Sequence, residues 1–62
     1  MRVSDIGNNQ IMVIDRSDKF ITYEITPLSA RIIEKRGDRW TPPRLKMAWN
    51  KAKEFFNAKF KT

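Results

Sequence analysis

Residues 19–26 show the clearest period-two pattern in the chain. One side of an extended segment would carry Ile21, Tyr23 and Ile25, and the other side would carry Phe20, Thr22 and Glu24. Residues 11–14 form a short apolar run, and residues 15–18 supply turn chemistry, so residues 11–26 predict a β-hairpin. Pro27 ends the second strand, because proline cannot donate to a sheet ladder.

Two further strands are expected on either side of this hairpin. Residues 2–6 predict a short strand, joined to the next one through the tight-turn tripeptide at residues 7–9. Residues 30–35 predict a strand that ends at a turn over residues 36–38, where Gly37 can supply a positive φ.

The register of the strand over residues 30–35 stays open. If Ile32 faces the core, the open face carries Arg31, Ile33 and Lys35; if Ile33 faces inward, it carries Glu34 and Arg36.

The last third of the chain changes from a period of two to the helical period. Apolar residues recur at three- and four-residue steps: Leu45, Ala48, Trp49, Ala52, Phe55, Phe56 and Phe60. Thr41 is the expected N-cap, Pro42 the first helical residue, and Trp40 and Leu45 are placed to form a hydrophobic staple. One border of the stripe carries Lys46 and Lys53, and the other carries Arg44 and Lys51.

These elements predict a single α+β domain over residues 1–62. We expect a small antiparallel meander of three to four strands within residues 2–40, in the form of an SH3-like or chromo-like half-barrel, and one amphipathic C-terminal helix over residues 42–60. A chain of this size buries only ~60% of its unfolded surface, so we expect no deep active-site cleft. The layout resembles the small archaeal chromatin proteins and chromo-like domains, which bind nucleic acid or nucleic-acid-associated tails from the sheet. The resemblance covers element order and charge and assigns no residue.

Charge separates the two halves of the chain. Residues 1–30 hold three basic and four acidic residues, a net charge of −1, whereas residues 31–62 hold ten basic and three acidic residues, a net charge of +7. Such a concentration indicates an anionic partner. Cations at a helix N-terminus are unfavourable unless an anion joins them, and Arg39 and Arg44 flank the predicted start. The candidate nucleic-acid-binding residues are Arg31, Lys35, Arg36, Arg39, Trp40, Arg44 and Lys46; the alternative is a solvated basic surface without a ligand.

A second signal indicates a protein interface. Residues 11–14 present aliphatic side chains to both faces of a strand, but one helix covers only one face of a sheet. Met12, Ile14 and Phe20 are therefore candidate interface residues, for a partner protein or for a homodimer through the sheet. A strongly curled sheet that buries both faces in one core is the alternative.

Composition narrows the function further. The chain has no Cys and no His, which excludes disulfides, thiolate zinc sites and imidazole ligands, so we expect no enzyme, no catalytic residue, no metal and no cofactor. Asp15 and Asp18 are better placed to cap a turn than to bind a cation. With no apolar segment long enough for a membrane, a cytoplasmic protein is expected.

The pattern and the charge together predict a small basic protein that binds DNA or RNA, mainly through the phosphate backbone and with low sequence specificity. The alternative is a protein-binding regulator, such as a phage- or plasmid-encoded inhibitor, that docks on an acidic surface of a host protein.

Overall fold

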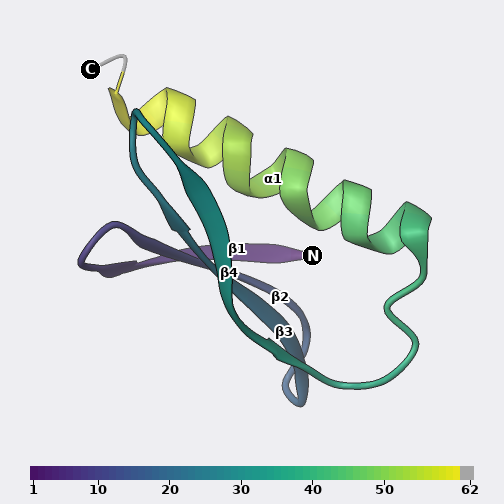
Figure 1. Ribbon diagram of the computed structural model, residues 1–62. Helices are drawn as coiled ribbons and strands as arrows, with labels where there is room; N and C mark the ends of the chain where they lie inside the picture. The colour runs from purple at the N-terminus through teal and green to yellow at the C-terminus, as the bar shows by residue number, and fades with distance from the viewer. Residues whose placement is uncertain (61–62) are drawn as a thin grey trace.

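The computed structural model describes residues 1–60, except for the side chain of Phe60. Four strands form one antiparallel sheet in the order β1-β2-β3-β4, and a C-terminal helix lies against it (Figure 1). The elements are β1 (Arg2–Gly7), β2 (Gln10–Arg16), β3 (Lys19–Ile25), β4 (Ala30–Arg36) and α1 (Pro42–Phe60). This architecture confirms the predicted small α+β fold.

A tight turn joins β1 and β2, the first two strands of the meander. Asn8 and Asn9 both have positive φ, 54° and 64°, as the central residues of a type I′ hairpin turn require. The preceding Gly7 also has a positive φ of 86°, and its N–H donates to Asp5 Oδ1 at 2.9 Å. The turn chemistry expected of residues 7–9 is therefore present.

The loop between β4 and α1 lies tightly against the start of β3. Gly37 has a φ of 97°, and a Cβ atom at this position would lie 2.7 Å from Lys19 Cγ and 2.9 Å from Lys19 Cα. Further along the loop, Trp40 donates its indole N–H to the carbonyl of Arg36 at 2.9 Å, and Lys19 Nζ lies 5.0 Å from the Trp40 ring centroid. Only glycine fits at position 37, and the loop holds the helix start beside the sheet.

The core lies between α1 and the face of the sheet that it covers. Ile11 pairs with Tyr23 and Val13 with Ile21, so all four side chains point to the same side. The buried core consists of Ile11, Val13, Ile21, Tyr23, Ile25, Ala48 and Ala52. The two alanines are fully buried and let the helix backbone approach the sheet closely. The predicted apolar stripe faces the sheet, apart from Phe60, whose side chain lies outside the described residues.

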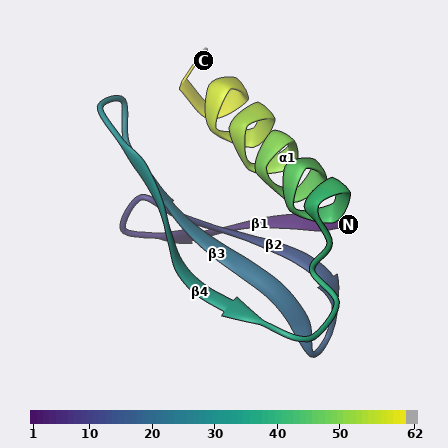
Figure 2. The ribbon, with the colours of Figure 1, turned by 45° about the vertical axis from the view of Figure 1, so that its right-hand side comes forward.

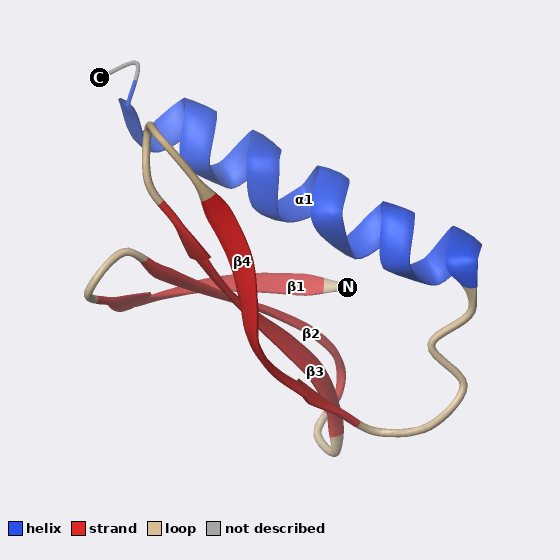
Figure 3. Cartoon of the chain, in the orientation of Figure 1, coloured by secondary structure: helices blue, strands red, loops and turns tan. Residues whose placement is uncertain are grey.

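The helix covers three strands of the sheet and leaves β4 uncovered. Its Cα atoms come within 8 Å of those of β1, β2 and β3, but not of β4, within the described chain. Figures 2 and 3 show α1 over one face of the sheet, and in Figure 2 β4 is the strand that lies away from the helix. At the helix end, Lys59 Nζ donates to Asp5 Oδ2, and this bond, with the Gly7 N–H, lowers the pKa of Asp5 below its ordinary value.

A β-bulge in β4 decides which side chains face the helix. Tyr23 pairs with Ile32, but its neighbour Thr22 pairs with Glu34, so Ile33 is an extra residue. Because of this bulge, β4 follows neither of the two regular registers over its whole length. Ile32 faces the helix side, as in the first register, whereas Glu34 and Arg36 face the open side, as in the second. Lys35, which pairs with Ile21, faces the helix side.

Within residues 1–60, no helix combines the length and the apolar character needed to cross a bilayer.

Candidate nucleic-acid interface

The face of the sheet opposite α1, called the open face below, carries one continuous row of paired residues. Arg2 pairs with Ile14, Ile14 with Phe20, and Phe20 with Arg36. Directly paired residues point to the same side of a sheet. Because neighbouring strands lie about 4.8 Å apart, the row spans about 14 Å between the two arginine Cα atoms. An aliphatic and an aromatic side chain thus lie between two guanidinium groups.

Two further rows continue this face. The second row is Ser4, Met12, Thr22 and Glu34, and the third is Gln10, Glu24 and Arg31. The apolar side chains therefore lie on the central strands β2 and β3, and the arginines of these rows lie on the edge strands β1 and β4.

The apolar part of the open face forms a hollow. It has a volume of about 430 Å³, and its walls include Arg2, Met12, Ile14, Arg16 and Phe20. Met12, Ile14 and Phe20 are each half-buried, because α1 covers only the other face. The structure thus brings the three candidate interface residues together in one surface depression.

Two arginines of this face are oriented by acidic neighbours. Arg31 Nε lies 2.9 Å from Glu24 Oε1, and Arg36 Nε lies 2.8 Å from Glu34 Oε2. The arginine side chains remain 72% and 68% exposed. Exposed ion pairs of this kind contribute about 0–1 kcal/mol, and a guanidinium has further N–H donors, so both arginines can still bind a phosphate.

The other candidate nucleic-acid-binding residues lie elsewhere. Lys35 faces the helix side, Lys46 lies on α1, and Arg39 lies in the loop before the helix. Trp40 packs partly buried against the core, with its N–H bound to a backbone carbonyl, which leaves it poorly placed for stacking. Of the predicted set, the structure places only Arg31 and Arg36 on the open face.

A carboxylate of the protein itself lies beside the cations at the N-terminus of α1. Asp15, whose side chain is 13% exposed, lies 3.6 Å from Arg44 and 3.4 Å from Lys19 Nζ. The first turn of α1 contains no acidic residue, so this carboxylate supplies the negative charge that the cations near the helix start require. A bound phosphate is therefore not needed to explain Arg44 at this position.

Sequence reasoning missed Arg2 and Arg16. Both lie within residues 1–30, which have a net charge of −1, so a search for clustered positive charge does not select them. The signal that identifies Arg2 is its pairing with Ile14, and this pairing depends on a bulge between Asp5 and Gly7. Counting back from the turn without the bulge would have paired Arg2 with residue 15.

Comparison with known proteins gives no functional assignment. A scan against protein-family models found no match, and searches of curated proteins and of solved structures found no similar protein. Function is therefore inferred from the side chains described above.

Proposed function

We propose that this protein binds single-stranded nucleic acid on the open face of its sheet, mainly through the phosphate backbone and with low sequence specificity. The observation that carries the proposal is the row Arg2, Ile14, Phe20 and Arg36. Phe20 offers a ring on which a base stacks, and the arginines at both edges lie where phosphates on either side of that base would pass. The formal net charge of +6 assists association with a polyanion.

Low specificity follows from the residues available. An aromatic ring accepts any base, because every base has a π-face. The polar, uncharged side chains of the open face are few: Ser4 and Gln10 lie on it, and Thr22 is buried. Backbone contacts therefore dominate the affinity. A single strand fits better than a duplex, since the bases of a duplex are already stacked on each other. The cytoplasmic location expected from the sequence is part of this proposal.

A salt titration tests the proposal. Arg2, Arg31 and Arg36 would neutralise about three phosphates, so log K should fall with log salt at a slope of about −2 on a single strand. Labelled single-stranded DNA, RNA of the same sequence and the matching duplex are compared at several salt concentrations. The duplex should bind more weakly than either single strand. No binding at low salt would exclude the proposal.

A pair of double variants locates the interface. Arg2→Ala with Arg36→Ala should reduce the steepness of the salt slope by about 1.4, because two phosphate contacts are lost. Arg39→Ala with Lys51→Ala removes the same charge away from the open face and is the matched control. Equal losses in both double variants would show that net charge alone, rather than this face, governs binding.

The apolar hollow favours a second function, a protein-binding regulator that anchors its partner on Met12, Ile14 and Phe20. Met12→Lys distinguishes the two functions. An added cation in the hollow should preserve or strengthen nucleic-acid binding, whereas it should abolish docking of an apolar protein surface. Recovery of one stoichiometric protein from a nuclease-treated extract, lost in Met12→Lys, would favour the regulator.

A further inference from the structure

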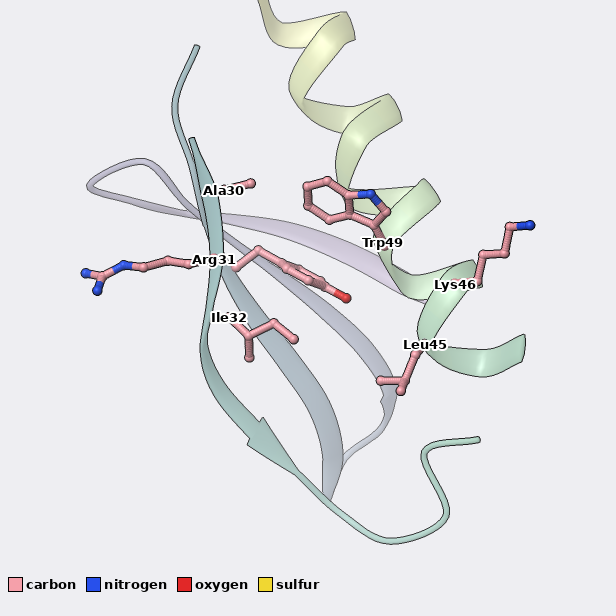
Figure 4. A pocket seen from close by; sticks show the side chains of 7 residues that line it. Ala30, Arg31, Ile32, Leu45, Lys46 and Trp49 are labelled. Atoms are coloured by element: carbon pink, nitrogen blue, oxygen red, sulfur yellow. The ribbon is translucent and has the colours of Figure 1, made fainter. Parts of the chain in front are cut away.

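A second surface lies on the helix side of the sheet, in a groove between β4 and α1. The groove has a volume of about 510 Å³ and is lined by Tyr23, Ala30, Arg31, Ile32, Leu45, Lys46 and Trp49 (Figure 4). Its size falls within the range of about 300–1,000 Å³ that is usual for ligand pockets. The groove exists because α1 lies over β1, β2 and β3 and leaves β4 uncovered.

The groove is apolar inside and cationic at its borders. Figure 4 shows Ile32, Leu45 and Trp49 pointing into the space between strand and helix, whereas Arg31 and Lys46 point away from it. The Trp49 ring lies 5.4 Å from the Tyr23 ring, at an angle of 50°. Ile32 remains 51% exposed, so a large apolar side chain of β4 has no cover.

The wall that β4 contributes is also the edge of the sheet. β4 pairs with β3 on one side, and no strand within residues 1–60 pairs with its other side. An edge strand presents unpaired N–H and C=O groups to an added strand, and side-chain pockets beside the edge then select the sequence of that strand. An uncovered edge beside an apolar groove is the geometry that β-strand addition requires.

The charge around the groove indicates which kind of strand can add to β4. Lys35 of β4 faces the helix side, and Lys46 and Lys53 lie along the helix border beside Trp49, with Lys53 Nζ 5.6 Å from its ring. None of these three lysines forms an ion pair within the described residues. A second copy of β4 would bring like charges together, because β4 holds three cations and one acid. A nucleic acid has no backbone amide groups that could hydrogen-bond to the edge of β4 as an added strand does.

We propose that this groove binds an extended acidic segment of another protein, which adds to β4 as a fifth strand. An apolar side chain of the segment would fill the space between Ile32 and Trp49. The bulge at Ile33 places Ile32 and Lys35 on the same side of β4, so the segment residue two positions beyond the apolar one faces Lys35. The segment therefore has the pattern apolar, any residue, acidic.

The test uses the full chain, labelled with nitrogen-15, and the seven-residue peptide Thr-Val-Thr-Glu-Thr-Val-Thr, which matches β4 in length and carries its glutamate two positions from each valine. The peptide should shift the Trp49 indole resonance and the amides of β4, and it should slow hydrogen exchange at alternate β4 amides. The same peptide with lysine in place of glutamate is the charge control, and the glutamate peptide methylated at alternate backbone nitrogens is the ladder control. Neither control should bind.

Three variants locate the peptide. Lys46→Glu and Lys53→Glu should each weaken binding about two- to fivefold, in keeping with exposed ion pairs. Lys51→Glu, the same charge change on the other border of the helix, should leave the affinity unchanged. Equal binding of the lysine peptide, shifts confined to the open face, or a free protein that already dimerises through β4 would each overturn the proposal.

Discussion

Replacing Phe20 with alanine isolates the stacking contribution proposed for the open face. Phe20 pairs with Ile14 on one side and with Arg36 on the other, so a base over its ring would lie between the two edge arginines. Stacking on an aromatic side chain contributes about 1–3 kcal/mol per base. Since 1.4 kcal/mol is a factor of ten, the dissociation constant should rise about 5- to 150-fold. The salt slope should stay unchanged, because the arginines remain.

The same substitution also affects folding. Complete loss of a buried phenylalanine costs about 3–5 kcal/mol, and Phe20 is only half-buried, so a cost of about 1–3 kcal/mol is expected. Two conservative variants separate folding from stacking. Phe20→Leu keeps the apolar side chain and removes the ring, whereas Phe20→Tyr keeps the ring. Leucine should lose nearly as much affinity as alanine, and tyrosine should lose little.

The assay is fluorescence anisotropy of a labelled oligothymidylate, read well below the thermal midpoint of each variant and at several salt concentrations. Thermal unfolding of each variant checks that the protein stays folded. Binding by Phe20→Leu as tight as that of the unsubstituted protein would refute a stacking role for Phe20. A shallower salt slope in Phe20→Ala would also refute that role, because the phosphate contacts would then have changed.

Three further predictions concern the fold. Gly37→Ala should destabilise the protein by about 2 kcal/mol more than Gly7→Ala, measured by urea unfolding: both positions have positive φ, but only at Gly37 does the new Cβ meet backbone, and equal losses would contradict this. Thr22→Val should raise stability by about 1 kcal/mol, because the buried Thr22 Oγ1 has no hydrogen-bond partner among the described residues; a loss of stability would show that a partner exists. The folded pKa of Asp5 is lowered, mainly by Lys59, so its contribution is present above the unfolded pKa and is lost as pH falls through the folded value. Asp5→Asn should therefore be less stable at neutral pH and lose less stability on acidification, as followed by thermal unfolding; equal acid sensitivity would contradict the assignment.

The secondary structure could be predicted because its signals are local. The turn at Asn8 and Asn9 and the helix start at Pro42 depend on residues within a few positions of each other. Bulges carry no such signal. Ile33 is β-branched and apolar, as an ordinary strand residue would be, yet its extra place in β4 decides which side Lys35 and Arg36 face. The composition of the open face therefore depended on a feature that periodicity does not show.

The candidate site was predicted only in part, because ion pairs join residues far apart in the chain. Charge counting placed Arg44 among the candidate nucleic-acid-binding residues, but it does not show that Asp15 lies 3.6 Å away. Aliphatic character on both faces of β2 did identify Met12 and Ile14 as residues that the helix leaves uncovered, since one helix covers one face. Their arginine neighbour Arg2 follows only from strand pairing.

The bulge at Ile33 also bears on solubility. Ile32 and Ile33 are 51% and 44% exposed on an edge strand, a combination that favours stacking of strands into fibrils. A bulge twists the strand, so identical flat edges cannot align in series. Deletion of Ile33 would leave Tyr23 opposite Ile32 and Thr22 opposite Glu34, and both faces would keep their side chains. The shortened β4 would, however, present a regular edge, and the chain would gain a tendency to aggregate that the extra residue now suppresses.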